Sequence, residues 1–344
     1  GQQFRLVSVS GPSTPVVVTG PVNVTGNYVA QYLVTFGQAG LDSTATSTVV
    51  TVNAAAKSYA ILPYSFWVDT GTSVTYVYNS IVSSSAGGKQ FRLTGVSGPA
   101  TPIVVTGTLT VTGNYVTQYL VTFTQTGLDS SATGTVVTVN GNAKAFGDLA
   151  YSLWVDTGTS VTYVYNSIVS SSAGGKQFRL TGVSSAASPF TVTGPVTVTG
   201  GYVVQYSVTF SDTGLDNTAS GTVVTVNGTA RIFSQLPYSF WVDTGSSILY
   251  SYTSTVPSSS TGQQFRLVSV SGPSTPVVVT GPVNVTGNYV AQYLVTFGQA
   301  GLDSTATSTV VTVNAAAKSY AILPYSFWVD TGTSVTYVYN SIVS

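Results

Sequence analysis

The chain has 344 residues with ten basic and ten acidic side chains, a formal net charge of zero and 43% hydrophobic residues. Charged residues make up 6% of the chain, against about 25% in an average soluble domain, and His, Cys and Met are absent. This balance argues against nucleic-acid or anionic-lipid partners and against disorder. The absence of Cys and His excludes disulfides, thiol catalysis and the usual zinc ligands. No apolar run reaches 18 residues, so we expect no membrane span.

The sequence is a tandem repeat with a period of 87 residues. Its tryptophans recur at that spacing, and residues 1–83 and 262–344 are identical. A period this long is typical of a self-contained small domain, not of one turn of a solenoid. We therefore expect four domains joined by short Ser/Ala/Gly segments. The predicted domains are 1–83, 88–170, 175–257 and 262–344, the last identical to the first.

Within the first repeat, apolar and polar residues alternate, which predicts half-buried β-strands. At position 17 the copies carry Val17, Val104 and Thr191, so this position is expected to face outward and its neighbours inward. The apolar phase shifts near Val7, which predicts a β-bulge. Gly, Pro, Asn and Ser mark the expected turns, as at Gly26 and Asn27. The predicted strands are 3–10, 15–19, 22–28, 30–36, 46–52, 57–61, 64–68 and 73–81.

No segment has helical periodicity, and seven or eight short strands in a repeat are typical of an Ig-like sandwich. The predicted fold class is therefore all-β, a tandem array of four Ig-like antiparallel β-sandwich domains. The Ser/Ala/Gly segment at 83–87 is interpreted as a joint between domains. It is too short for free tumbling, so neighbouring domains are expected to be semi-rigidly coupled.

Three segments carry a resemblance to a known family: Phe-Arg-Leu-Thr-Gly-Val-Ser-Gly at 91–98, Val-Thr-Val-Thr-Gly-Gly-Tyr at 196–202 and Trp-Val-Asp-Thr-Gly-Thr-Ser-Val-Thr-Tyr at 67–76. The chain resembles the tandem β-rich, Ig-like repeat of bacterial and archaeal cell-surface and extracellular filament proteins. Val96 departs from the pattern, which often has Trp there. The resemblance covers every repeat and implies a stalk, sheath, adhesin or surface filament.

We therefore expect an extracellular or cell-surface structural protein, archaeal rather than bacterial, whose modules polymerise or bundle with copies of itself. No enzymatic activity and no cofactor are expected. The alternative function is an adhesin or glycan-binding array, with surface glycans as partners. Period-two strands with free edges favour association by strand pairing.

An Asp-Thr-Gly motif recurs at Asp69, Asp156, Asp243 and Asp330. The same tripeptide forms the active-site turn of aspartic proteases, in which two carboxyl groups share a proton. The competing interpretation is a tight turn capped by Asp, with Gly supplying a positive φ. Evenly spaced modules of this size offer no flap or cleft, so we favour the turn.

Four charged positions recur in register in the repeats: Arg5, Asp42, Lys57 and Asp69, with Arg231 in place of the Lys in the third repeat. Their recurrence predicts structural ion pairs. Two alternatives remain: Asp42 or Asp69 as part of a Ca²⁺ site, and a Lys–Asn or Lys–Asp isopeptide bond, which Arg231 cannot form.

Trp67 alternates with the inward-facing Phe66 and Val68 and is therefore expected on the opposite strand face. Such a ring is a candidate contact between modules or chains, or a sugar-stacking platform. The candidate interface aromatics are Trp67, Trp154, Trp241 and Trp328, and the candidate N-glycosylation sites are Asn23, Asn227 and Asn284.

Overall fold

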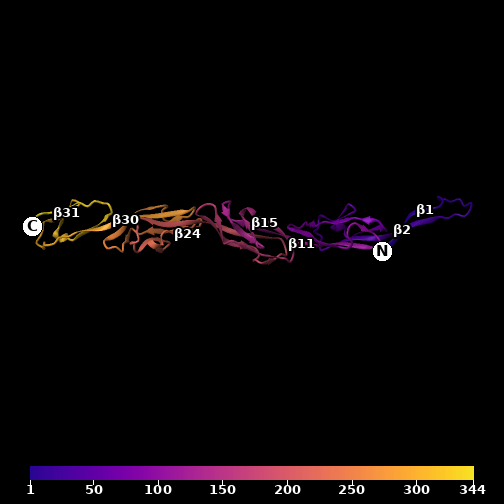
Figure 1. Ribbon diagram of the computed structural model, residues 1–344, viewed down its shortest axis with the longest axis horizontal. Coiled ribbons are helices and arrows are strands. Elements are labelled where there is room, and N and C mark those ends of the chain that lie inside the picture. Colours follow the sequence, from indigo (N-terminus) through magenta and orange to yellow (C-terminus); the bar gives the residue numbers. More distant parts are fainter. The chain divides into compact units, whose positions relative to one another are not determined.

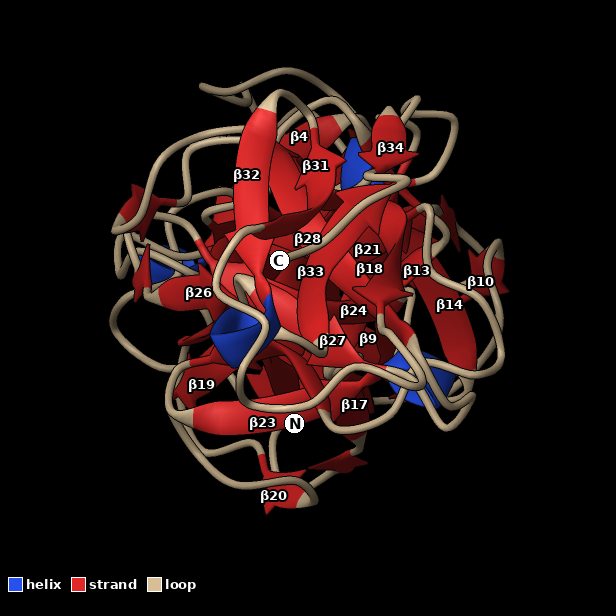
Figure 2. Cartoon of the chain, turned by 90° about the vertical axis from the view of Figure 1, so that its left-hand side faces the viewer, coloured by secondary structure: helices blue, strands red, loops and turns tan.

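The computed structural model describes the whole chain, Gly1–Ser344, and its regular structure is almost entirely β-strand (Figure 2). None of its helices is long and apolar enough to cross a membrane. The predicted all-β class is confirmed. The helical segments are four short 3₁₀ turns: η1 Tyr59–Ile61, η2 Phe146–Asp148, η3 Phe233–Gln235 and η4 Tyr320–Ile322.

The repeats share one succession of strands, from which the first, third and fourth repeats lack some short members that the second repeat has. In the first repeat these are β1 Gln2–Ser10, β2 Thr25–Ala39, β3 Thr48–Val52, β4 Ala55–Ser58, β5 Tyr64–Asp69, β6 Ser73–Val74, β7 Tyr76–Tyr78 and β8 Ile81–Ser83. In the second they are β9 Lys89–Ser97, β10 Ile103–Val104, β11 Leu109–Thr126, β12 Ala132–Thr133, β13 Thr135–Val139, β14 Asn142–Ala145, β15 Tyr151–Asp156, β16 Ser160–Val161, β17 Tyr163–Tyr165 and β18 Ile168–Ser171.

The third and fourth repeats continue the pattern. The third has β19 Lys176–Ser184, β20 Phe190–Thr191, β21 Val196–Thr213, β22 Thr222–Val226, β23 Thr229–Ile232, β24 Tyr238–Asp243, β25 Ser247–Ile248, β26 Tyr250–Tyr252 and β27 Thr255–Pro257. The fourth has β28 Gln263–Ser271, β29 Val277–Val278, β30 Val283–Phe297, β31 Thr309–Val313, β32 Ala316–Ser319, β33 Tyr325–Asp330 and β34 Tyr337–Tyr339.

The chain divides into two compact units, which are described separately. The first unit comprises Gly1–Thr126, Thr135–Asn166 and Thr181–Gly201. The second comprises Gly127–Gly134, Ser167–Leu180 and Tyr202–Ser344.

The first unit contains a complete β-sandwich core, here called core A. One sheet has the strand order β8-β9-β11-β2-β5, and the facing strands are β4-β3-β7 with the short β6–β10 pair. Core A buries Val34 and Phe36 of β2, Phe91 of β9 and Tyr115 of β11, among others. Its stabilisation comes from the burial of these apolar side chains between the two layers.

Core A corrects the predicted domain boundaries. Its buried residues run from Val34 to Tyr115, so it combines the later part of the first repeat with the start of the second. The predicted domain 1–83 leaves out the part of core A that follows residue 83, and the predicted domain 88–170 assigns that part to a different domain. The expected joint at 83–87 is also wrong, because this segment is the turn between β8 and β9, whose Val82 and Phe91 lie in the same core.

The long strands explain this arrangement. The sequence predicts separate strands at 22–28 and 30–36 with a turn at Gly26, but β2 continues from Thr25 to Ala39 without a break. In core A, β2 also pairs in parallel with β11, with Leu109 opposite Val34. The predicted sandwich was purely antiparallel, and the exception arises because two successive repeats place equivalent strands side by side in one sheet.

The second unit also contains a core that two successive repeats build together. Core B consists of buried residues from Val208 to Tyr289, again taken from two successive repeats. A smaller cluster, here called half-core C, contains Phe297, Val311 and Val313. Strand β30 supplies Val283, Val285 and Tyr289 to core B and Phe297 to half-core C. One uninterrupted strand therefore belongs to two successive cores.

The predicted facing of side chains is confirmed where a core is complete. Ile103 and Val105 are buried while Val104 between them is exposed, as expected from the comparison of copies. The bulge predicted near Val7 is present, because the β1–β2 register shifts between Leu6 and Ser8. These features follow from period-two burial, which local sequence encodes directly.

Candidate functional site: the polar junction of the long strands

A polar network crosses the sheet near the middle of each long strand. In the first repeat it comprises Gln3 and Arg5 on β1, Gln31 on β2 and Asp69 at the end of β5, and we call this set and its copies the polar junction. Strand β2 lies between the other two, with Gln31 opposite both Gln3 and Asp69. Gln31 is buried, as are its counterparts, and buried polar groups need hydrogen-bond partners.

The hydrogen bonds of the junction form a chain across three strands. Gln3 Nε2 donates to Gln31 Oε1 at 2.8 Å, and Gln31 Nε2 donates to Asp69 Oδ1 at 2.7 Å. Arg5 donates from Nε to Asp69 Oδ1 at 3.1 Å and from Nη2 to Asp69 Oδ2. A two-point guanidinium–carboxylate pair is geometrically specific, so the junction holds β1, β2 and β5 in one register.

The electrostatics of the junction favour the charged carboxylate. Hydrogen bonds from Arg5 and then from Gln31 hold the pKa of Asp69 below its ordinary value. The second repeat repeats the pattern, with Arg92 lowering the pKa of Asp156. Both pairs are partly exposed, where ion pairs contribute little stability on their own. We infer that the network specifies register more than it adds stability.

The junction lies where a strand passes between two cores. On β30, Gln292 stands between Tyr289, which is in core B, and Phe297, which is in half-core C. It donates to Asp330 at 2.8 Å and accepts from Gln264 at 2.8 Å. The apolar cores are thus separated along this strand by a satisfied polar layer.

The Asp-Thr-Gly motif coincides with this junction. Asp69 and Asp156 each face a guanidinium and a glutamine amide instead of a second carboxyl group. Gly71 and Gly158 have positive φ values of 80° and 82°, which Gly adopts without steric cost. The geometry is that of a turn closing β5 and β15, and it does not contain the shared-proton pair of an aspartic protease.

The other predicted charged residues are not part of the junction. Asp42 pairs with Lys89, at the start of the next repeat, and Lys57 lies over the ring of Tyr64 at 3.9 Å from its centroid. The hydrogen bond from Lys89, assisted by Thr44, lowers the pKa of Asp42 to about 2. Arg231, at the position of Lys57, lies over Tyr238, also at 3.9 Å. No cluster of three or more Asp side chains is present that could hold a metal ion.

The tryptophans lie on the face opposite the core, as their alternation with Phe66 and Val68 predicts. Trp67, Trp154, Trp241 and Trp328 are all partly exposed, and each pairs with the adjacent long strand. In the first repeat a Cβ on Gly1 would lie 3.3 Å from the Trp67 ring. The three sequon residues Asn23, Asn227 and Asn284 are exposed, and the Asn227 side chain accepts a bond from the Leu249 amide at 2.9 Å.

Sequence reasoning missed the glutamines and Lys89. Gln3 and Gln31 are unchanged in all four repeats. An uncharged polar residue that stays the same among apolar strand positions was the signal that could have identified them. Lys89 gave a weaker signal, because its counterparts are Gln2, Lys176 and Gln263.

No protein-family model and no curated protein matches the sequence. Among solved structures, the Bacillus anthracis TIE protein is similar with 10% identity and a TM-score of 0.21, over 78% of this chain and 54% of its own. The open form of the pilus adhesin SpaC from Lactobacillus rhamnosus GG is 12% identical with a TM-score of 0.20, over 78% and 45%. A streptococcal ancillary pilin is 11% identical with a TM-score of 0.17, over 75% and 98%.

The chain thus spans about half the length of the first two of these proteins. Similarity this low indicates neither a common fold nor a common function.

Proposed function

We propose that the chain is a non-catalytic structural subunit of an extracellular filament, stalk or sheath on a prokaryotic cell surface. The observation that carries the proposal is strand β30, which belongs without interruption to core B and to half-core C. Successive modules of this kind are interlocked and not merely tethered. Such interlocking suits a load-bearing or scaffolding role, because no flexible linker separates the cores along this strand.

Two further features support an architectural role outside the cell. The carboxylates Asp69 and Asp156 of the junction are engaged in ion pairs, and no group of three or more Asp side chains is placed to hold a metal ion. The surface carries few charges and many hydroxyl groups, a composition of prokaryotic surface proteins. We propose an archaeal source, and a hot or acidic habitat fits the absence of Cys, Met and His.

Antibodies raised against the polypeptide would test this role on the cells that produce it. Immunogold electron microscopy should label filaments, stalks or sheath material outside the cell envelope, and pre-immune serum should not. Labelling confined to the cytoplasm would contradict the proposal. Assays for proteolysis at low pH, with Asp69→Asn as the comparison, should show no activity that depends on this carboxylate.

An adhesin or glycan-binding array is the second candidate function. It is favoured by one observation, the partly exposed indole ring that every repeat presents on the face opposite its core. Binding on a glycan array that disappears in the Trp154→Ala and Trp241→Ala variants would support it. Binding that survives those substitutions would assign the tryptophans to packing alone.

A further inference from the structure

The first repeat begins with an apolar surface that has no partner within the chain. Phe4 is 66% exposed, whereas its counterpart Phe91 in core A is fully buried at 0%. Val18 and Tyr28 are also exposed, although Val105 and Tyr115 are buried in core A. In Figure 1, β1 and the start of β2 project from the rest of the first unit as a bare two-stranded ribbon. We call residues 1–29 the donor segment.

The fourth repeat ends with the complementary deficiency. Tyr337 is 59% exposed, whereas Tyr76 in core A is 7% exposed. Tyr339 and Ile342 are exposed as well, and residues 334–335 and 342–344 lack the strand pairing that β6 and β8 have in core A. We call residues 291–344, which contain half-core C, the acceptor segment.

Both segments are present elsewhere in the chain in filled form. Residues 262–290 are identical to the donor segment, and they complete core B. Residues 30–83 are identical to the acceptor segment, and they are completed in core A by residues 88–115. Each half of the missing interface is therefore seen bound to a close equivalent of the other half.

From this we infer that the donor segment of one copy completes the acceptor segment of a second copy, so that the 344-residue polypeptide associates head to tail. The inference rests on the proposed filament role and names the segments that would join copies of this polypeptide. It is made for the polypeptide of residues 1–344.

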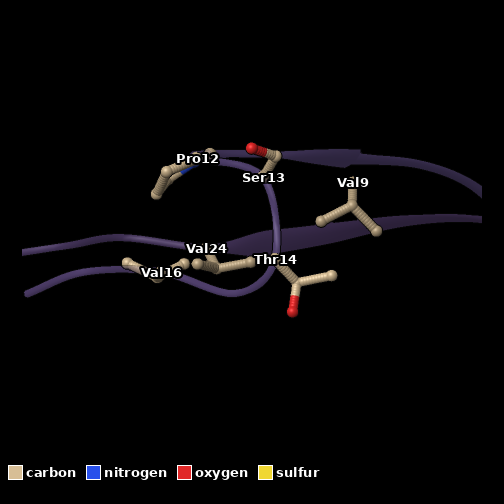
Figure 3. Close-up of a pocket in the computed structure, with 7 residues that line it drawn as sticks. Val9, Pro12, Ser13, Thr14, Val16 and Val24 are labelled. Atoms are coloured by element: carbon tan, nitrogen blue, oxygen red, sulfur yellow. The ribbon is translucent and has the colours of Figure 1, made fainter.

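The donor segment contains a hollow, and the equivalent residues of core A show which side chain of a second copy would occupy this hollow. It has a volume of about 690 Å³ and is lined by Val9, Pro12, Thr14, Val16 and Val24, among others (Figure 3). In core A the counterparts of Pro12 and Thr14 bind one tyrosine: the Tyr76 hydroxyl donates to the Pro99 carbonyl at 2.7 Å, and the Tyr76 amide donates to Thr101 Oγ1 at 3.0 Å.

The second unit repeats these bonds. There the Tyr250 hydroxyl donates to the Pro273 carbonyl at 2.6 Å and the Tyr250 amide to Thr275 Oγ1 at 3.1 Å. The fourth repeat carries Tyr337 at this position, so the hollow of one copy is the seat for Tyr337 of the next.

The strand register of the joint follows from core A. Strand β8 pairs with β9 so that Val82 lies opposite Phe91, which places Val343 of one copy opposite Phe4 of another. Only the counterpart of the turn 84–87 is missing from the joined structure. Because the two surfaces differ, each association leaves one free donor and one free acceptor, and growth stays open-ended unless a ring closes.

The joint should be weaker than the internal cores. Ile103 pairs with Val74 in core A, and Val277 pairs with Ile248 in core B. The joint instead brings Val16 against Val335, a pair with one methylene fewer, which reduces buried apolar surface. We therefore expect association that depends on protein concentration.

Sedimentation velocity of the purified polypeptide over a range of concentrations tests the inference. The unmodified chain should form a series of multimers that grows with concentration. Phe4→Asp should block the donor and Val343→Asp the acceptor, so each variant alone should remain monomeric. Their equimolar mixture should stop at a dimer, because one intact donor and one intact acceptor remain.

Val17→Asp is the matched control. Val17 is 84% exposed, and its counterpart Val104 stays 60% exposed in a completed core, so this variant should associate like the unmodified chain. Loss of association in Val17→Asp as well would indicate nonspecific apolar aggregation and overturn the inference.

Two further outcomes would overturn it and separate it from the filament role. A chain that stays monomeric at every concentration has no such joint, although surface labelling on cells would still support the filament role. Multimers that persist in Phe4→Asp and Val343→Asp would point to lateral association, which leaves the filament role intact and removes this joint. Far-ultraviolet circular dichroism should confirm that every variant is folded.

Discussion

Tyr115 donates its hydroxyl group to the carbonyl oxygen of Asn79, at 2.9 Å, across the boundary between the first and second repeats. It also donates to the carbonyl oxygen of Val49, at 3.2 Å. The hydroxyl is desolvated, which raises the pKa of Tyr115. One hydroxyl proton of a repeat is thus shared between two carbonyl groups of the repeat before it. This contact exists only because successive repeats share a core.

Tyr115→Phe should lower the stability of core A by about 1–2 kcal/mol, because it removes the hydroxyl donor from the Asn79 carbonyl group. The Val49 carbonyl group keeps its hydrogen bond from the Asn79 amide, at 2.9 Å. The matched control is Tyr28→Phe, at the same position of the first repeat, where the ring is 64% exposed. In dilute protein the control should leave stability unchanged. Hydrogen exchange at the amides of β3 and β7 measures the effect, and equal effects of the two substitutions would contradict shared cores.

Gly113 is required by the ring of Tyr78. A Cβ at this position would lie 2.4 Å and 2.6 Å from two carbon atoms of that ring, and the ring is held by hydrogen bonds from its hydroxyl to the carbonyl oxygens of Gly37 and Val111. Gly113→Ala should therefore destabilise core A by about 1–3 kcal/mol through overpacking.

Gly95→Ala is the control for this substitution, because a Cβ on Gly95 would meet nothing within 4 Å. Its effect should stay within about 0.5 kcal/mol. Thermal unfolding followed by circular dichroism compares the two variants. A neutral Gly113→Ala would mean that the Tyr78 ring moves aside without cost.

This glycine also explains where sequence reasoning failed. A Gly-Asn pair between apolar segments is a common turn signal, and it predicts a break at Gly26 and Asn27. In the completed core the equivalent Gly113 lies inside the continuous strand β11, where its missing side chain makes room for Tyr78. The tyrosine comes from the preceding repeat, so no local pattern could identify the contact.

The domain boundaries failed for a related reason. A repeat with no insertions defines the length of the module but not the point at which one module begins, since every starting residue has the same period. Alternation of polar and apolar residues is a local property, and it predicted correctly that Val34 and Phe36 face the core. The charged residues of the junction stood out by recurring in a chain with few charges, whereas Gln31 carries no charge and did not.

The Asp42–Lys89 pair should make stability depend on pH only in acid. The pKa of Asp42 is lowered to about 2 in the folded chain from an ordinary 3.8. Its stabilising contribution is therefore complete above the unfolded value and is lost as the pH falls through about 2. We expect the unfolding temperature to be flat from pH 7 to pH 5 and to fall between about pH 4 and pH 2.

Lys89→Gln tests this assignment with a residue that the first and fourth repeats already carry at the position. Its unfolding temperature should lie below that of the unmodified chain at pH 7, and the difference should close as the pH approaches 2. Lys57→Gln removes a cation that lies over an aromatic ring instead of a carboxylate, so any difference it causes should not change with pH. A Lys89→Gln difference that is constant with pH would refute the pair.

Asp212 should act in the opposite direction. Burial raises the pKa of this carboxyl group, so its charged form disfavours the folded state, and the penalty disappears as the pH falls through the folded pKa. The other repeats carry Gln38, Gln125 and Gln299 at this position, and the Gln38 side chain accepts a hydrogen bond from the Leu41 amide at 2.9 Å. Asp212→Gln should therefore stabilise the chain at pH 7.

The pH dependence separates this cause from a simple packing gain. If charge burial is responsible, the stabilisation by Asp212→Gln should shrink in acid as Asp212 itself becomes protonated. Calorimetric unfolding of both proteins at pH 7 and in acid would show the change, with Gln299→Asp as the reciprocal substitution in the fourth repeat. A stabilisation that is the same at both pH values would assign the effect to the longer side chain and not to the buried charge.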